Sequence, residues 1–181
     1  ELPAAAAGDL PTLVTREAVC GDLHSHTTWS DGAASIAEMV EGAAAVGHEY
    51  VAVTDHATGP GMVGGVGLDE AAIEEQAAAI AEAADEVDVP ILHGIEANID
   101  ADGDLSTDDE TLAALDLVVA SPHAALGQDR EAATERLVRA AEHPHVDVLG
   151  HPTGRLINER PGLDPDVEAV AEAAAASGTA I

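Results

Sequence analysis

Positive charge is scarce in this chain of 181 residues. It contains no lysine, and six arginines face 35 aspartates and glutamates, so the formal net charge at pH 7 is −29. Six cationic side chains cannot form the basic surface with which most proteins bind nucleic acid, and that class of interface is excluded. Disordered acidic chains are poor in apolar residues, whereas 46% of these residues are hydrophobic. The sequence therefore predicts a folded domain with a strongly acidic surface.

Cysteine and long apolar runs are also nearly missing. The single cysteine, Cys20, excludes an intramolecular disulfide and fits a reducing compartment, so we expect a cytoplasmic protein. No apolar run approaches the roughly 18 residues that a membrane helix needs, and no signal peptide is visible, so no membrane partner is expected. The first residue is Glu1 rather than Met, which suggests a segment of a longer protein.

The acidic excess has a consequence for the solvent in which the chain folds. A charge of −29 predicts strong self-repulsion in dilute buffer. At 1 M salt the screening length falls to about 3 Å, and this repulsion largely disappears. We interpret the composition as adaptation to the hypersaline cytoplasm of a halophile. The alternative is an acidic protein from a GC-rich genome without salt adaptation.

The order of elements indicates an α/β fold. Residues 1–20 show no long periodicity and read as a lead-in or linker, whereas short apolar segments alternate with Ala- and Glu-rich helical patterns from Gly21 onwards. Strands are predicted at 22–26, 50–54, 91–99, 115–120 and 146–149, with a last one opening at Thr179. Helices are predicted between them, beginning at Ser35, Asp69, Thr107, Asp129 and Asp164. This alternation predicts a parallel sheet covered by helices, either as a barrel or as an open sheet.

Candidate metal ligands lie at or directly after the ends of the predicted strands. Functional residues of parallel α/β proteins collect at the carboxyl ends of strands. Five consecutive strands deliver an imidazole or a carboxylate there, namely His24 and His26, His56, Glu96, His123 and His151. One such residue would usually be structural, but five strands in succession predict a multinuclear site for Zn²⁺, Mn²⁺ or Fe²⁺. Structural roles are expected for His48, His93, His143 and His145.

Several motifs resemble those of the polymerase and histidinol phosphatase (PHP) family. The stretch Gly21-Asp-Leu-His-Ser-His-Thr-Thr-Trp-Ser-Asp-Gly32 is similar to the first motif of that family. Its later motifs are matched in order by Thr54-Asp55-His56, Gly94-Ile95-Glu96, Pro122-His123 and Gly150-His-Pro-Thr-Gly-Arg155. Residues 9–14 and 127–130 look like the PHP domain at the C-terminus of family X DNA polymerases. The resemblance covers nearly the whole chain.

The resemblance implies a fold and its limits. The family fold is a distorted (β/α)7 barrel, so residues 21–181 are expected to form a PHP metallophosphoesterase domain with about five to six β/α units. The chain stops where the sixth strand begins and lacks the Asp-x-His motif that supplies the last two ligands of the family. We therefore expect a C-terminally truncated, incomplete barrel that lacks its C-terminal strands.

The resemblance also implies two to three divalent metal ions. The first ion would be bound by His24, His26 and Glu96, and Glu96 would bridge to a second, held with His123 and His151. A third would be bound by Asp31 and His56. A metal-bound hydroxide positioned by Glu96, His123 and His151 would be the nucleophile. Arg155 is a candidate for binding phosphate, because guanidinium matches phosphate geometry, and its alternative role is a surface ion pair.

The function implied is a metal-dependent phosphoesterase, a hydrolase of phosphate esters. The polymerase-like stretches favour a 3′→5′ exonuclease or DNA 3′-end processing in repair, with an upstream family X polymerase domain in the same full-length chain. The alternatives are a small-molecule phosphatase similar to histidinol phosphatase, a relative of the TatD-type deoxyribonucleases, and a non-catalytic structural domain. Barrel hydrolases with a carboxylated lysine bridge are excluded, because the chain has no lysine.

The charge analysis makes a prediction about salt. Circular dichroism should show a cooperatively folded protein in molar KCl and loss of structure in dilute buffer, because screening removes the acidic self-repulsion. A native, cooperative spectrum at low salt would contradict the halophile interpretation.

Overall fold

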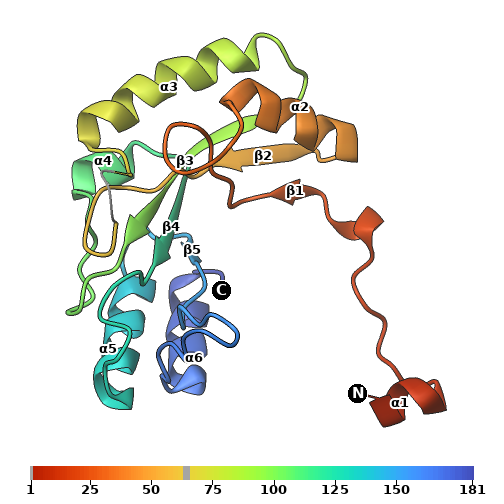
Figure 1. The fold of residues 1–181 in the computed structure, drawn as a ribbon, viewed down its shortest axis with the longest axis vertical. Coiled ribbons are helices and arrows are strands. Elements are labelled where there is room, and N and C mark those ends of the chain that lie inside the picture. Colours follow the sequence, from red (N-terminus) through yellow and green to blue (C-terminus); the bar gives the residue numbers. More distant parts are fainter. Residues whose placement is uncertain (1, 63–65) are drawn as a thin grey trace.

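Five short parallel strands form the centre of the molecule. The computed structural model describes residues 2–62 and 66–181, and its strands lie in one sheet in the order of the chain. They are β1 (Gly21–Asp22), β2 (Tyr50–Val53), β3 (Ile91–Asn98), β4 (Leu117–Ser121) and β5 (Val148–Leu149). The sheet curls into part of a barrel (Figure 1). This confirms the α/β class and the incomplete barrel. The unbroken order favours a barrel over a doubly wound sheet, whose strand order reverses at a switch point.

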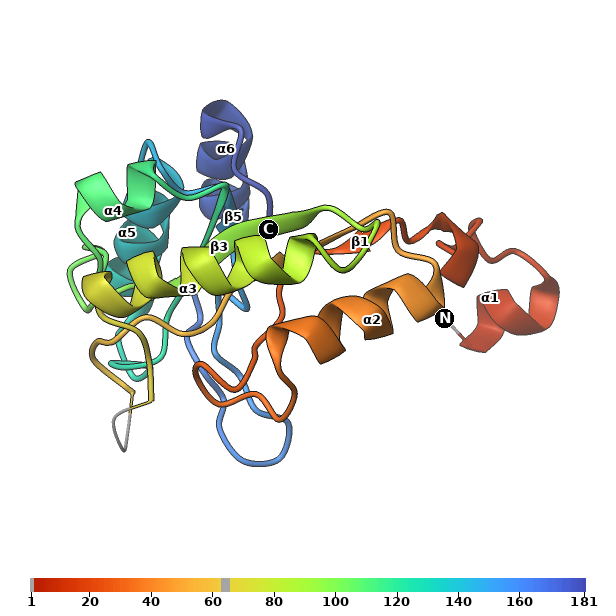
Figure 2. The ribbon, with the colours of Figure 1, turned by 90° about the horizontal axis from the view of Figure 1, so that it is seen from above.

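Helices cover the outside of the curled sheet. The helices that follow the strands are α2 (Ile36–Val46), α3 (Glu70–Ala84), α4 (Asp109–Ala113), α5 (Arg130–Ala141) and α6 (Val167–Ser177). Helices α2 and α3 lie along one part of the sheet, and α5 and α6 pack beside each other at the other part (Figure 1). The N-terminal segment carries α1 (Leu2–Ala7) and a 3-10 turn (Arg16–Ala18) away from this body (Figure 2).

Acidic side chains begin most of these helices. Ser35 and Glu38 form the predicted capping box at α2, in which each side chain accepts a hydrogen bond from the backbone N–H of the other. Aspartates cap the next four helices at positions 69, 108, 129 and 166, each accepting a backbone N–H of the first turn. A carboxylate at a helix N-terminus is stabilising. Part of the large negative charge therefore stabilises the fold.

Three local predictions need correction. The first strand is only two residues long, because the hydroxyl groups of Ser25 and Thr54 replace the regular ladder after Asp22. Helix α4 is capped by Asp108 rather than by Thr107. Helix α6 is capped by Asp166 rather than by Asp164, since the Asp166 side chain accepts the Ala169 N–H.

The last predicted strand begins where expected. Ala180 pairs in parallel with Val148, and its carbonyl accepts a hydrogen bond of 2.9 Å from the N–H of Leu149. The neighbouring hydroxyl of Thr179 donates to the carbonyls of Ala141 and Val146 and is buried. A sixth parallel position thus begins to form next to β5.

The central strands are buried on both faces, as expected of a parallel sheet covered by helices. All five residues of β4 are buried, and so are Val51, Ala52 and Val53 of β2. Three fully buried alanines of α5, at positions 133, 140 and 141, let this helix approach its neighbours closely. Within the described residues, no helix has the length and apolarity that crossing a membrane requires.

Arg136 on α5 is the largest fully buried side chain, with 1% of its surface exposed. Its guanidinium donates to the carbonyl of Ala124, to the side-chain oxygen of Gln128 and to the carbonyl of Ile99. These partners lie just beyond the carboxyl ends of β3 and β4. The buried guanidinium therefore ties the two loops at the end of the sheet where the predicted metal ligands lie.

Replacing Arg136 by leucine should lower the free energy of unfolding by about 3 kcal/mol or more, because it leaves buried carbonyl groups without charged donors. Arg139 on the same helix is 59% exposed and pairs with Asp104 at the surface, so Arg139→Leu should cost less than about 1 kcal/mol. Denaturant unfolding in molar KCl measures both values. Equal losses would show that the buried guanidinium does not hold these loops.

Candidate metal centre

Glu96 lies at the centre of the candidate site. It is on β3, and only 1% of its side chain is exposed. Five imidazole rings surround its carboxylate. Nitrogens of His24, His123 and His151 lie 3.4, 3.4 and 2.9 Å from Oε1, and nitrogens of His26 and His56 lie 3.5 and 2.7 Å from Oε2. The structure thus brings together all six residues that follow the predicted strands.

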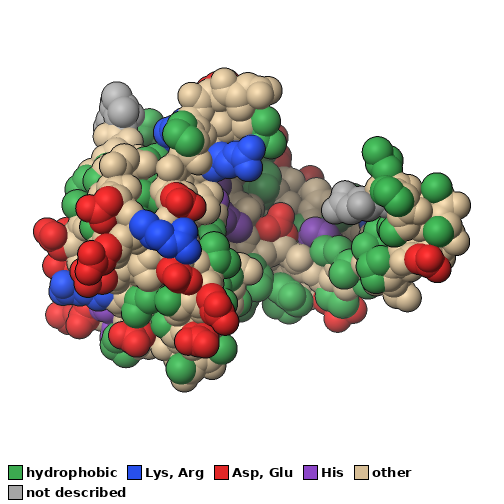
Figure 3. Space-filling model, turned by 90° about the horizontal axis from the view of Figure 1, so that it is seen from below, with side chains coloured by type: hydrophobic (Ala, Val, Ile, Leu, Met, Phe, Trp, Pro, Cys, Tyr) green, Lys and Arg blue, Asp and Glu red, His purple; other side chains and the backbone are tan. Residues whose placement is uncertain are grey.

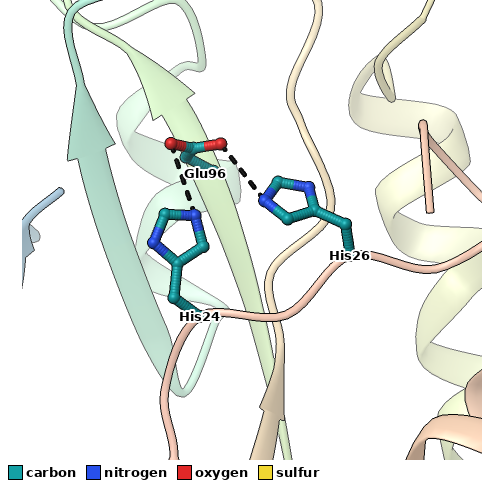
Figure 4. A group of neighbouring side chains, drawn as sticks. All are labelled: His24, His26 and Glu96. Carbon is teal, nitrogen blue, oxygen red and sulfur yellow. Dashed lines mark ion pairs between the residues drawn. The ribbon is translucent and has the colours of Figure 1, made fainter. Parts of the chain in front are cut away.

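The loop after β1 carries His24 and His26 to opposite ends of this carboxylate (Figure 4). Ser25 between them is buried and faces β2, where its hydroxyl donates to the carbonyl of Ala52 over 2.6 Å. The two histidines consequently project to the other side, as their spacing of two residues predicts. Gly150 also matters here, because a Cβ at that position would collide with the Ser121 hydroxyl and crowd the His24 ring.

A second buried carboxylate, Asp55, shapes the loop that carries Asp31. Its oxygens accept hydrogen bonds from the N–H and hydroxyl of Thr27 over 2.7 Å each, from the Ser30 hydroxyl over 2.5 Å and from the Gln76 amide over 2.7 Å. Asp31 directly follows Ser30. The loop that carries Asp31 is therefore fixed to Asp55, after the end of β2, through both its backbone and its side chains.

Asp31 and His56 meet beside Glu96. His56 pairs in parallel with Glu96 in the extension of the β2–β3 ladder. Its Nδ1 faces Glu96, and its Nε2 lies 3.6 Å from Asp31 Oδ2. His26 also lies between the two carboxylates, but with its nitrogens reversed: Nε2 faces Glu96, and Nδ1 lies 3.5 Å from Asp31 Oδ1. Two histidines thus separate the two carboxylates.

His123 and His151 approach Glu96 from the loops after β4 and β5. The Nδ1 of His123 lies 2.5 Å from Asn98 Oδ1, which leaves Nε2 toward Glu96. His151 has a backbone φ of 24°, an uncommon conformation for a residue with a side chain. Such strain at a concave site is a feature of functional positions.

The donor set fits divalent cations. Within residues 2–62 and 66–181, both Glu96 oxygens and the Nδ1 atoms of His26 and His56 are buried without a hydrogen bond of good geometry. Most separations between imidazole nitrogens and carboxylate oxygens in this cluster are 3.4–3.6 Å, which is long for a hydrogen bond. Two ligands at about 2.0 Å from one tetrahedral ion are about 3.3 Å apart. A cation would satisfy these orphaned atoms together.

Among the residues that the structure describes, three groups of side chains have ligand atoms within 4.8 Å of one another. They are His24, His26 and Glu96; His26, Asp31 and His56; and His56, Glu96 and His123. The first group coincides with the set implied for the first metal. The second group contains Asp31 and His56, the pair implied for the third metal, together with His26. The third group contains Glu96 and His123, which were implied for the second metal, but it has His56 in place of His151.

The electrostatics also suit a cationic occupant. Burial raises the pKa of Glu96, but the imidazoles of His123, His151, His24 and His56 lower it by more, so Glu96 is held as a carboxylate. The carboxylate in turn raises the pKa of His151. Burial lowers the pKa of His26, assisted by the neighbouring His56. The buried anion thus faces one ring, His26, whose lowered pKa resists protonation, and another, His151, whose protonation it favours.

Arg155 lies apart from this cluster. It is exposed and, with Arg160, lines an open hollow of about 740 Å³ in the loop 153–164 that follows His151. In Figure 3, purple histidine and red acidic side chains lie in a recess, and blue arginine side chains lie at its border. Among the ion pairs of the described residues, Glu96 has only histidine partners, and Arg155 is not one of them.

The other histidines occupy different surroundings. His93 lines a groove between α3 and α4 with Glu70, Ile73 and Glu110, on the opposite side of β3 from Glu96. His143 pairs with Asp109 over 3.3 Å. Neither residue is among the imidazoles that surround Glu96.

Sequence reasoning missed two supporting residues. Asp55 stands within the Thr54-Asp55-His56 motif, and its signal was a charged residue directly after an apolar strand. Asn98 is two residues after Glu96, and the period of a strand places both on one face. Neither pattern predicts which residues Asp55 and Asn98 would bind, because their hydrogen-bond partners come from segments distant in sequence.

Residues 22–176 match the PHP domain family, and they include all seven predicted ligands and Arg155. The chain belongs to the PHP domain family. It is 39% identical over 170 residues to "DNA polymerase/3′-5′ exonuclease PolX" of Bacillus subtilis, covering 93% of this chain and 30% of that protein. A "Probable phosphatase" of Caldanaerobacter subterraneus is 35% identical over 162 residues, covering 84% of this chain and 57% of the relative. Another, of Acetivibrio thermocellus, is 36% identical over 161 residues, covering 87% and 61%.

These relatives differ in length. The chain spans 30% of the Bacillus polymerase and 57% and 61% of the two phosphatases. The expected resemblance to PHP domains, including those of family X polymerases, is confirmed.

The centrality of Glu96 can be tested by metal analysis. Glu96→Gln should lower metal affinity more than about 100-fold, because loss of a ligand costs more than the 10–100-fold loss from an outer-shell partner. His93→Ala, on the other side of the same strand, should keep wild-type occupancy. Metal content after dialysis against Mn²⁺ or Zn²⁺ gives both values. An equal loss in both variants would refute the assignment of strand faces.

Proposed function

We propose that the PHP centre binds two to three divalent cations through His24, His26, Asp31, His56, Glu96, His123 and His151 and hydrolyses phosphate esters. The observation that carries this proposal is the buried Glu96 carboxylate with five imidazoles within 3.5 Å. Zn²⁺, Mn²⁺ and Fe²⁺ all suit imidazole and carboxylate ligands.

The protein's own residues prepare the reaction. When bound, divalent cations supply positive charge that polarises a phosphoryl group and lowers the pKa of water. Glu96 offers an oxygen on each side of its carboxyl group, so it suits a bridge between two cations. His123 and His151 border the same oxygen, Oε1, and with it they would orient the attacking water. The Asp55 network keeps the Asp31 loop in place while substrate binds.

For the substrate we favour the 3′ ends of DNA. The relative that carries the words "3′-5′ exonuclease" in its name covers 93% of this chain, and it is a polymerase. A polymerase domain in the same full-length protein would deliver such ends. Arg155 and Arg160 line a hollow in the loop that follows His151, and they are suited to bind a phosphate next to the one that is cleaved.

A second candidate is the hydrolysis of small phosphate monoesters. Relatives named "Probable phosphatase" are 35% and 36% identical and cover most of this chain. The two functions share the metal centre and differ in what lies outside it, because a nucleic-acid strand needs anchoring beyond the scissile phosphate.

A nuclease assay separates these candidates. The substrate is a DNA duplex with one strand labelled at its 5′ end. With Mn²⁺ in molar KCl, the protein should shorten this strand from its 3′ end, and EDTA should abolish the reaction. Arg155→Gln should raise KM for DNA about tenfold and leave the hydrolysis of p-nitrophenyl phosphate nearly unchanged, because the small ester does not reach the loop.

Arg139→Gln, which removes a surface arginine on α5, is the matched control and should alter neither reaction. Hydrolysis of p-nitrophenyl phosphate without any shortening of DNA would favour the phosphatase. If neither substrate is cleaved with any of the three metals, the catalytic proposal is wrong.

A further inference from the structure

Asn98 is buried completely between two of the proposed ligand loops. It is the last residue of β3, and none of its surface is exposed. Its side-chain NH₂ donates to the carbonyl of Ala57 over 3.0 Å, and its Oδ1 lies 2.5 Å from the Nδ1 of His123. One amide group therefore joins the residue after His56 to the ring of His123.

The carbonyl of Ala57 fixes the orientation of this amide. A backbone carbonyl only accepts hydrogen bonds, so the NH₂ group of Asn98 must face it. The oxygen of the same amide then faces His123. Because that oxygen also only accepts, the Nδ1 of His123 must carry the proton that is donated. In the neutral ring the remaining nitrogen, Nε2, then carries the lone pair, and it faces Glu96 at 3.4 Å from Oε1.

We infer that Asn98 is a positioning residue that holds His123 in the tautomer able to bind a cation through Nε2 and couples it to the end of β2. The inference rests on the proposed metal-binding role of His123, but not on the reaction or its substrate. A histidine ligand whose second nitrogen donates to an oxygen acceptor is held in orientation and is a better base toward the metal.

Hydrogen bonds to the backbone near Asn98 and His123 hold the two residues next to each other. Asn98 pairs with Ser121 in the β3–β4 ladder, and the next N–H, of Ile99, donates to the Ser121 carbonyl over 2.9 Å. Arg136 donates to the carbonyls of Ile99 and Ala124, the residues that follow Asn98 and His123. The buried guanidinium thus holds the chain just beyond both partners.

Space on the other side of the amide is also restricted. Gly59 has a φ of 158°, and a Cβ there would lie 2.8 Å from Asn98 Nδ2. The backbone N–H of Asn98 donates to the Ser106 hydroxyl over 3.1 Å, and its carbonyl accepts the Ser106 N–H over 3.0 Å. The loops that carry Gly59 and Ser106 therefore lie against Asn98, the first beside its side-chain amide and the second along its backbone.

The test uses two readouts that do not depend on activity. Long-range ¹H–¹⁵N correlation spectra of the histidine rings report which nitrogen is protonated, with His123 assigned by the loss of its signals in His123→Ala. Competition with a chromogenic chelator gives the affinity for Zn²⁺. The wild-type protein should show His123 protonated at Nδ1 and should bind Zn²⁺.

Three variants then locate the effect. Asn98→Leu should lose the Nδ1 preference and bind Zn²⁺ about 10–100-fold more weakly. Asn98→Asp keeps an oxygen acceptor, so it should keep Nδ1 protonation and an affinity much closer to that of the wild type. Ser106→Ala removes a hydrogen bond to the backbone of the same residue and should change neither readout.

The outcomes separate this inference from the proposed function. If the wild-type protein binds no Zn²⁺, the proposed metal centre is wrong. If it binds Zn²⁺ and folded Asn98→Leu keeps both affinity and tautomer, only the role of Asn98 is wrong. If Asn98→Leu does not fold, Asn98→Asp decides, and a tenfold or greater loss of affinity in the folded Asp variant overturns the acceptor argument.

Discussion

A buried carboxylate surrounded by imidazoles is the constraint on which the rest of this structure depends. Removing Glu96 from water is costly unless compensating groups surround it, and five ring nitrogens from four loops do so. Bringing those rings to one point requires parallel strands in chain order, since each loop must leave the same edge of the sheet. The curled β/α architecture is therefore the scaffold of a single cluster, and loops held by Asp55, Asn98 and Arg136 give the cluster its fixed geometry.

Much of this arrangement could be predicted from the sequence, for a physical reason. In a parallel sheet the carboxyl ends of all strands meet at one edge, so residue type and position after a strand suffice to gather His24, His56, Glu96 and His123. The helix boundaries followed from capping chemistry that is local in sequence, as at Ser35. Where two acidic or hydroxyl residues compete for a cap, as Asp108 does with Thr107, local pattern does not decide, because the geometry of the preceding loop selects the cap.

What could not be predicted depends on contacts between distant segments. The sequence gives no indication that Asp55 binds Thr27, Ser30 and Gln76, or that the Arg136 side chain is buried in a chain where cations are rare. The placement of His26 and His56 is equally non-local, because each presents its two nitrogens to the two carboxylates of Asp31 and Glu96. The acidic surface is a separate matter. It is the basis of the salt prediction, whereas the proposed chemistry depends on the residues around Glu96.

The most direct test of this account is an anomalous difference map from crystals grown with Mn²⁺ or Zn²⁺, recorded on both sides of the absorption edge of the metal. The account predicts peaks within bonding distance of both oxygens of Glu96, with His24, His26, His123 and His151 around them. A map without a peak at Glu96, or with metal bound only to surface carboxylates, would contradict it.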